Sequence, residues 1–208
     1  MRKVVVHNSV TLDGVMQSPG DPTEDVRGGF QHGGWAVPYS DPAMYGDAGE
    51  GTGRSALLFG RRTYEKFYSY WPTAPQPNPF TDLLNNAEKF VASTTLTEPL
   101  PWVNSTLLGA DVPDAVARLK EQPGNDLVIL GSGELIQSLM PHNLIDVYRL
   151  LIHPLVLGSG RHLFPEDGSY ASLRLVTTAT TSTGVVMATY RQAGNSQAPG
   201  SKPYGATT

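Results

Sequence analysis

A glycine-rich turn between two apolar segments is the feature of this sequence that most directly suggests chemistry. Residues 127–130 form an unbroken apolar run typical of a buried strand, Gly131-Ser132-Gly133 follows, and residues 134–140 carry apolar side chains at helical spacing. A strand that turns through glycines into a helix leaves backbone N–H groups at the positive end of the helix dipole, which suits an anion such as phosphate. Many α/β proteins use a similar turn only to change direction, so both interpretations stay open.

Two other expected strand ends carry anion-binding side chains. The apolar run 56–59 is followed by Gly60-Arg61-Arg62-Thr63, and the run 89–93 leads into Ser93-Thr94. Ligands of open α/β sheets bind beyond the carboxyl ends of the strands, so these groups are expected to meet the glycine-rich turn on one rim. Arginine makes forked, charge-assisted bonds to phosphate, and two guanidinium groups with several hydroxyls favour a phosphorylated dinucleotide. Alternatively, both arginines are solvated residues at a helix start, where their charge opposes the helix dipole.

Asp41 and Asp13 are the carboxylates considered as proton donors. Inside an apolar pocket, burial would raise the pKa of Asp41 toward neutrality, as a general acid requires. Asp41 is equally suited to cap a helix that begins at the following proline, and Asp13 is equally suited to a turn with Gly14. The aromatic residues Trp35 and Tyr39 could stack on a flat substrate or simply pack the loop around them.

Alternating strands and helices are expected to position these residues. Segments with strand character are 4–12, 56–59, 89–93, 106–108, 127–130, 146–153, 173–180 and 185–191, and segments with helical character are 63–70, 80–87, 112–122 and 134–140. The early alternation predicts an α/β fold with a mostly parallel sheet flanked by helices, and the last two β-branched segments predict an antiparallel edge. Residues 13–40 form a loop far longer than the usual connection of about 4–6 residues, and we interpret residues 15–40 of it as a candidate lid.

Composition excludes several classes of function. The 208 residues suit one domain, for which we expect residues 1–191, followed by a loose tail over residues 192–208. A net charge of −4 with no basic cluster larger than Arg61-Arg62 argues against nucleic-acid binding. The absence of cysteine excludes disulfides and thiolate chemistry, and no metal-ligand spacing is present. Without a signal peptide, or an apolar run near the ~18 residues of a membrane span, the sequence predicts a soluble cytoplasmic protein.

Four motifs together resemble the dihydrofolate-reductase-like superfamily. Residues 57–65 (LLFGRRTYE) and 128–135 (VILGSGEL) resemble the strand–turn–helix and the cofactor turn of dihydrofolate reductases. Residues 9–16 (SVTLDGVM) and 148–164 (YRLLIHPLVLGSGRHLF) resemble more closely the reductase domain of bacterial riboflavin biosynthesis, and the match keeps its order from about residue 3 to residue 191. The resemblance implies a three-layer dihydrofolate-reductase-like fold with helices on both faces, NADPH as hydride donor and a homodimer through the late strands.

Carried over by position, the resemblance assigns roles to particular residues. Arg61 and Thr63, assisted by Arg62, would meet the cofactor phosphates, and Ser93 and Thr94 would lie near the adenosine 2′-phosphate. The turn at 131–134 would offer backbone N–H groups to the pyrophosphate. The expected cofactor-binding residues are Leu12, Gly60, Arg61, Arg62, Thr63, Ser93, Thr94, Gly131, Ser132, Gly133, Glu134 and Leu135, and the expected substrate-binding residues are Asp13, Gly14, Trp35 and Tyr39.

The sequence therefore predicts an NADPH-dependent reductase of a small heterocyclic substrate, nearer the riboflavin-pathway reductases than the folate reductases. Folate reductases carry a helical acid soon after a Trp-x-x-Pro motif; here Ser40 stands in that register and Asp41 one residue further, which favours the pyrimidine-reductase branch. Arg27 and Arg161 are the spare basic residues for a phosphorylated substrate. Two alternatives remain: a nucleotide-binding module without catalysis, and a carbonyl or quinone reductase of broad specificity.

Overall fold

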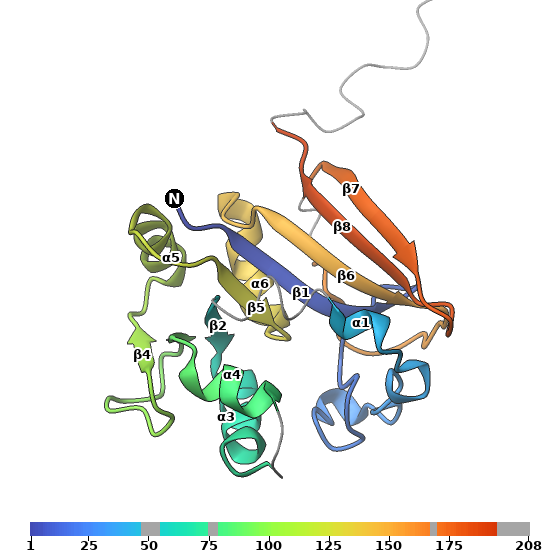
Figure 1. Ribbon diagram of the computed structural model, residues 1–208, viewed down its shortest axis with the longest axis horizontal. Coiled ribbons are helices and arrows are strands. Elements are labelled where there is room, and N and C mark those ends of the chain that lie inside the picture. The colour runs from blue at the N-terminus through green and yellow to red at the C-terminus, as the bar shows by residue number, and fades with distance from the viewer. Residues whose placement is uncertain (47–54, 75–78, 167–169, 195–208) are drawn as a thin grey trace, which may run out of the picture.

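A single eight-stranded sheet forms the centre of the computed structural model, which describes residues 1–46, 55–74, 79–166 and 170–194 (Figure 1). The strands are β1 Val4–Thr11, β2 Ala56–Gly60, β3 Lys89–Ala92, β4 Ser105–Leu108, β5 Leu127–Leu130, β6 Val147–His153, β7 Leu173–Thr180 and β8 Val186–Gln192. Their order across the sheet is β4-β3-β2-β5-β1-β6-β8-β7. β8 pairs antiparallel with β6 and β7, and the other neighbouring pairs are parallel. The expected mostly parallel sheet with an antiparallel edge is confirmed.

The apolar runs occupy the middle of the sheet because both of its faces are covered there. Val4 and Val6 of β1 lie beside Leu127 and Ile129 of β5 in parallel register, and all four side chains are fully buried. An apolar residue at every position of a strand is typical of this arrangement. β5 is thus a central strand, and the turn that follows it emerges in the middle of the sheet edge.

Helices cover the two faces in separate pairs. The helices are α1 Ala43–Gly46, α3 Arg61–Tyr70, α4 Pro79–Asn86, α5 Val112–Glu121 and α6 Gly133–Leu139. α5 and α6 pack their apolar stripes against one face, with Val116 and Ile136 fully buried. α3 and α4 cover the other face, where Tyr64 and Leu84 pack around Trp102. The chain therefore has the three-layer arrangement that the resemblance implied.

The long segment between β1 and α1 is held by a small core of its own. Val15, Phe30 and Trp35 form a separate buried cluster, and the Trp35 indole donates a hydrogen bond to the Gln17 carbonyl at 2.7 Å. The Gln17 side-chain amide bonds the carbonyls of residues 25 and 27 at 3.0 and 2.9 Å. Short 3-10 turns at Arg27–Gly29 and Val37–Tyr39 complete the segment. The candidate lid is an ordered layer beside the sheet edge.

Several helix boundaries differ slightly from the sequence-based expectation. The helix expected at 63–70 begins at Arg61, so both arginines lie in its first turn, directly after Gly60.

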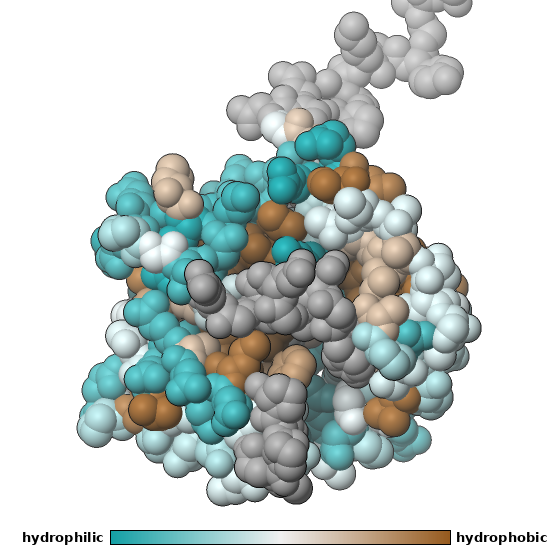
Figure 2. Space-filling view, viewed as in Figure 1, coloured by the Kyte–Doolittle hydropathy of each residue, from teal (hydrophilic) through white to brown (hydrophobic). Residues whose placement is uncertain are grey.

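At the far edge of the sheet, β7 is exposed along most of its length, and Figure 2 shows hydrophobic atoms reaching the surface beside β7 and β8. Across the described ranges, no helix has the length and apolar character needed to cross a membrane.

Candidate functional site

A cavity of about 1280 Å³ opens where the carboxyl ends of β2, β3 and β5 meet the long loop. Its wall continues along α3 and the first turns of α6, and its floor includes the middle of β1 and part of β6. The cavity is large enough for a dinucleotide together with a small second ligand, since single ligand pockets usually measure ~300–1000 Å³. It lies at the edge of an open α/β sheet where ligands are generally bound.

The expected cofactor-binding residues converge on this cavity, with one exception. The residues that line it are Gly60, Arg61, Arg62, Thr63, Ser93, Thr94, Gly131, Ser132, Gly133, Glu134 and Leu135. Leu12 does not line it: its side chain is 65% exposed and its N–H bonds the Leu155 carbonyl at 2.9 Å. Three separate turns of the sequence therefore share one rim, although their roles toward a ligand stay predictions.

The glycine-rich turn is fixed by side chains from neighbouring strands and helices. Asn8 accepts a hydrogen bond from Gly131 N–H at 2.8 Å and donates one to the Gly131 carbonyl at 3.1 Å. The N–H of Ser132 bonds Thr63 Oγ1 at 3.1 Å, and Ser132 Oγ accepts the N–H of Gly60 at 3.0 Å. Gly131 and Ser132 both have left-handed backbone angles, with φ of 59° and 53°. The turn is thus a rigid junction of β1, β2, β5 and α3.

These bonds correct one detail of the expected phosphate site. The N–H groups of Gly131 and Ser132 were expected to face a pyrophosphate, but both are paired with protein oxygens. The hydroxyl oxygen of Thr63 is likewise occupied, because it accepts the hydrogen bond from Ser132 N–H. The N–H groups of Gly133 and Glu134 belong to the first turn of α6, where the helix itself offers no acceptor.

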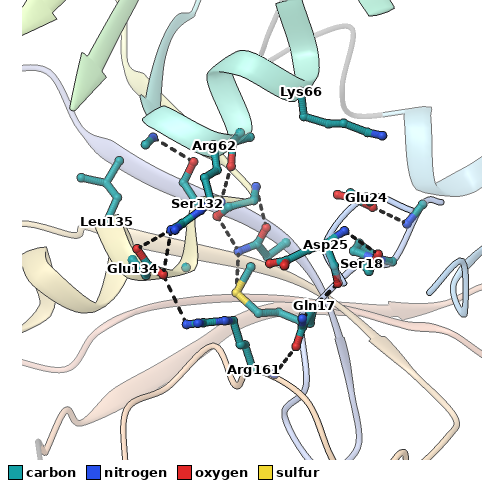
Figure 3. Close-up of a pocket in the computed structure, with 18 of the residues that line it drawn as sticks. Gln17, Ser18, Glu24, Asp25, Arg62, Lys66, Ser132, Glu134, Leu135 and Arg161 are labelled. Atoms are coloured by element: carbon teal, nitrogen blue, oxygen red, sulfur yellow. Dashed lines mark hydrogen bonds and ion pairs between the residues drawn. The ribbon is translucent and has the colours of Figure 1, made fainter. Parts of the chain in front are cut away.

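Charged side chains gather on the same rim. Arg61 makes a long contact of 3.4 Å with Glu65 one turn along α3, whereas Arg62 lies 3.3 Å from Glu134 on α6. Figure 3 shows Glu134 between Arg62 and Arg161, with its carboxylate directed at both. A hydrogen bond from Arg27 lowers the pKa of Glu134, and the positive charges nearby lower it further. Glu134 is therefore ionised at neutral pH.

The third strand end is also preorganised. Ser93 Oγ accepts hydrogen bonds from the N–H groups of Thr95 and Leu96 at 3.1 and 3.0 Å, which closes a tight turn after β3. Ser93 and Thr94 line the cavity after β3, which lies on the opposite side of β2 from β5 and its glycine-rich turn. Their placement is consistent with contact to a group at the end of a long ligand.

Asp41 does not have the environment expected of a proton donor. Its carboxylate caps α1 by accepting Ala43 N–H at 2.9 Å, and it accepts Ser182 N–H at 3.0 Å and the Ser182 hydroxyl. These bonds, the Ser182 hydroxyl first, lower its pKa, although burial alone would raise it. Asp41 is buried outside the residues that line the cavity. The expectation of a raised pKa is wrong, and the geometry supports the capping interpretation.

Asp13 and Gly14 also have structural roles. The Asp13 carboxylate accepts the Thr11 hydroxyl and the N–H groups of Leu157 and Gly158, the latter at 2.8 Å. The Thr11 bond is the main reason that its pKa is lowered. Gly14 provides a left-handed turn with φ of 82°. Neither residue lines the cavity, so the proposed contacts to substrate from Asp13 and Gly14 are not supported by their positions.

Trp35 and Tyr39 are packing residues of the loop. Both rings lie edge-on to His153, at centroid distances of 5.1 and 5.7 Å. They form a layer behind the cavity wall, while their neighbours Ala36, Val37 and Ser40 line it. The expected stacking of Trp35 and Tyr39 on a substrate therefore has no geometric support; the loop reaches the cavity through smaller residues.

Sequence reasoning missed a polar floor on the central strand. His7 and Ser9 lie two residues apart on β1, so they share one face of the sheet, and both line the cavity. No residue that the structure describes forms a hydrogen bond with either side chain. Burial lowers the pKa of His7, and Arg149, its neighbour on β6, lowers it further. The signal was visible: three polar residues interrupt the apolar pattern of a strand whose other residues are buried.

A carboxylate of the loop also borders the cavity. Glu24 lines it and accepts the N–H of Gly20 at 2.9 Å, and burial raises the pKa of this carboxyl. Proton-transfer groups often have pKa values displaced toward neutrality. With Asp41 and Asp13 directed elsewhere, His7, Glu24 and His153 are the described cavity-lining residues whose pKa is shifted mainly by burial.

Two proteins are similar in sequence to this chain along most of its length. Two Bacillus subtilis (strain 168) proteins of uncharacterised function are similar: YyaP, 29% identical over 195 residues and covering 91% of this chain and 94% of its own, and YwjB, 28% identical over 177 residues and covering 84% and 89%.

Solved structures share the fold at lower identity. A Shewanella sp. PV-4 protein named for riboflavin biosynthesis has a TM-score of 0.68 at 23% identity, covering 92% of this chain and 99% of its own. A pyrimidine reductase-like protein from Corynebacterium diphtheriae gives 0.63 at 13%, covering 92% of each chain. Enterococcus faecalis dihydrofolate reductase, solved with NADP(H), gives 0.58 at 17%, covering 92% and 96%. The model of the RibD C-terminal domain family matches residues 2–187, and the chain belongs to that family.

Proposed function

We propose that this chain is an NADPH-dependent reductase that transfers a hydride to a small heterocyclic substrate with a reducible C=N or C=O bond. The observation that carries the proposal is that one continuous cavity joins a rim of arginines and hydroxyls to a polar floor on β1. Membership of the RibD C-terminal domain family supports a reductase, and a dihydrofolate reductase with this fold binds NADP(H).

The cofactor's phosphates fit the donor groups on the rim. Arg61 in the first turn of α3, together with Ser93 and Thr94 after β3, would hold the 2′-phosphate. Arg62 and the N–H groups at the start of α6 would hold the pyrophosphate. A forked bond from one arginine to the 2′-phosphate would favour NADPH over NADH by ~10–100-fold. NADPH would supply the hydride, and the protein would supply position and exclusion of water.

The floor of the cavity would hold the substrate. Ser9 O–H and the His7 imidazole would bond the ring nitrogen or oxygen that becomes negative as the hydride arrives, and the imidazolium form of His7 would donate the proton. Apolar residues of the wall, Val37 and Leu151 among them, would cover the flat faces of a ring. Contact with the reacting heteroatom is assigned to these residues in place of Asp41 and Asp13.

One experiment tests the cofactor part of the proposal. Titration of the wild-type protein with NADPH and NADH should show a preference for NADPH, and Arg61→Ala should weaken NADPH binding about tenfold or more with little effect on NADH. Arg118→Ala is the matched control, because Arg118 is an exposed arginine of α5 paired with Asp114 outside the cavity. Equal losses for both cofactors would place the 2′-phosphate elsewhere.

Turnover then separates a reductase from a binding module. NADPH oxidation should be measured against dihydrofolate, the aminopyrimidine of riboflavin synthesis and a panel of carbonyls and quinones. Turnover with a heterocycle is the expected result. Tight NADPH binding with no turnover on the whole panel would support the alternative of a nucleotide-binding module, and turnover with carbonyls or quinones alone would support the broad-specificity alternative.

A further inference from the structure

Three arginines from separate parts of the chain meet on one carboxylate at the edge of the cavity. Oε1 of Glu134 lies 2.7 Å from Arg27 Nη1 and 3.3 Å from Arg161 Nη1, and both of its oxygens lie 3.3 Å from Arg62 Nη1. Arg27 comes from the long loop, Arg62 from α3 and Arg161 from the segment after β6. All four residues line the cavity, and Figure 3 shows Glu134 between two of these arginines.

The charges in this cluster do not balance. Arg27 has a second partner in Asp25, at 2.8 Å from its Nε, so three positive charges face two negative ones. Over the described ranges, Arg62 and Arg161 form an ion pair only with Glu134. Each guanidinium carries five N–H donors, so most donors of Arg62 and Arg161 are not directed at Glu134. Their side chains are about half exposed, at 52% and 50%, which leaves them accessible from the cavity.

The position of Glu134 explains how three like charges stay together. Guanidinium groups this close repel one another unless an anion lies between them. A carboxylate is planar and bidentate, as is the edge of a phosphate group, and arginine binds both in the same forked manner. A phosphate carries more charge and more acceptor oxygens than a carboxylate, so it competes well for the same donors.

We propose that Arg27, Arg62 and Arg161 form a binding site for a phosphate group, in which Glu134 is the internal anion that assembles the arginines and is displaced when the phosphate binds. The site does not include Arg61, Ser93 and Thr94, the residues proposed above to hold the 2′-phosphate. It rests on the proposed function in sharing both its cavity and Arg62. The phosphate belongs either to the diphosphate of the cofactor or to a phosphomonoester substrate, and the two sources bind with the same chemistry.

Removal of the internal anion provides the test. Inorganic pyrophosphate is titrated calorimetrically into wild type, Glu134→Gln, Arg161→Gln and Asp114→Asn at low salt. Glu134→Gln should bind pyrophosphate about three- to tenfold more tightly, because the competing carboxylate is gone, and Arg161→Gln should bind it correspondingly more weakly. Asp114→Asn removes the same charge from an exposed pair on α5 and should change nothing. Weaker or unchanged binding by Glu134→Gln would overturn the proposal.

Further measurements check that the variants fold and identify the molecule that supplies the phosphate. Glu134 is 60% exposed, so its variant should fold, and Arg161→Lys keeps the charge but loses the fork and should give an intermediate affinity. Competition by NADPH but not by ribose 5-phosphate assigns the site to the cofactor; binding of ribose 5-phosphate alongside NADPH assigns it to a substrate. Pyrophosphate binding that follows these variants in a protein unable to bind NADPH would refute the reductase and keep this site. If the protein turns over NADPH but substitution of the three arginines does not change its affinity for pyrophosphate, the phosphate site is refuted and the reductase proposal is kept.

Discussion

The two hydrogen bonds between Asn8 and Gly131 make Asn8→Ala the most informative single change. Asn8 is 5% exposed and both of its bonds, at 2.8 and 3.1 Å, go to one residue of the turn that follows β5. A side-chain-to-backbone bond contributes ~0.5–1.5 kcal/mol net, so the loss of two should destabilise the protein by about 1–3 kcal/mol. For a domain of this size, 2 kcal/mol corresponds to a fall of roughly 4–8 °C in melting temperature.

The same change should affect cofactor binding, because Asn8 holds the turn between Arg62 and the floor of the cavity in one conformation. A turn that is properly placed only part of the time lowers the apparent affinity by the fraction of time spent in place. Asn8→Ala should therefore weaken NADPH binding about threefold or more. Differential scanning calorimetry and an NADPH titration measure the two effects. Asn86→Ala, an exposed asparagine at the end of α4, is the control. Equal melting temperatures for Asn8→Ala and this control would refute the reasoning.

Two further predictions concern groups whose pKa is shifted. Asp41→Ala should lower the unfolding free energy by about 1–2 kcal/mol through loss of the cap on α1, while the turnover of the folded protein stays near wild type; a large fall in kcat with unchanged stability would restore Asp41 as the acid. Burial lowers the pKa of His7 below 6.5. We therefore expect kcat/KM to rise as the pH falls below 6.5 toward this lowered pKa, because the imidazolium form of His7 accumulates there. The unfolded chain binds this proton first, so the stability contributed by neutral His7 is lost as the pH falls below about 6.5. His7→Gln should flatten both profiles, and an unchanged rate profile would exclude His7 as the proton donor.

The sequence predicted the elements and the rim because both depend on local patterns. Apolar runs and helical spacing define β5 and α6, and carboxyl ends of parallel strands lie at the same edge, so Arg61 and Gly131 could be placed together without coordinates. Partners that are far apart in the chain have no such local signal. Asn8 and Gly131 are separated by 123 residues, and Asp41 and Ser182 by 141. Which hydrogen bonds a carboxylate or an amide makes is decided by the packing of the whole sheet.

The carboxylates that first suggested catalysis instead hold the long loop at its ends. Asp13 binds the N–H groups of Leu157 and Gly158 where the loop leaves β1, and Asp41 binds Ser182 where the loop enters α1. Between them, Arg27 ties the middle of the loop to Glu134. The pKa of each of these three carboxyls is lowered by its hydrogen bonds, so their stabilising effect is present above the unfolded values near 4 and is lost as the pH falls through the lower folded values. Of the three contacts, the Arg27–Glu134 pair is the one that a phosphate can replace at neutral pH, which makes the middle of the loop the part that should respond to a ligand while its ends stay fixed.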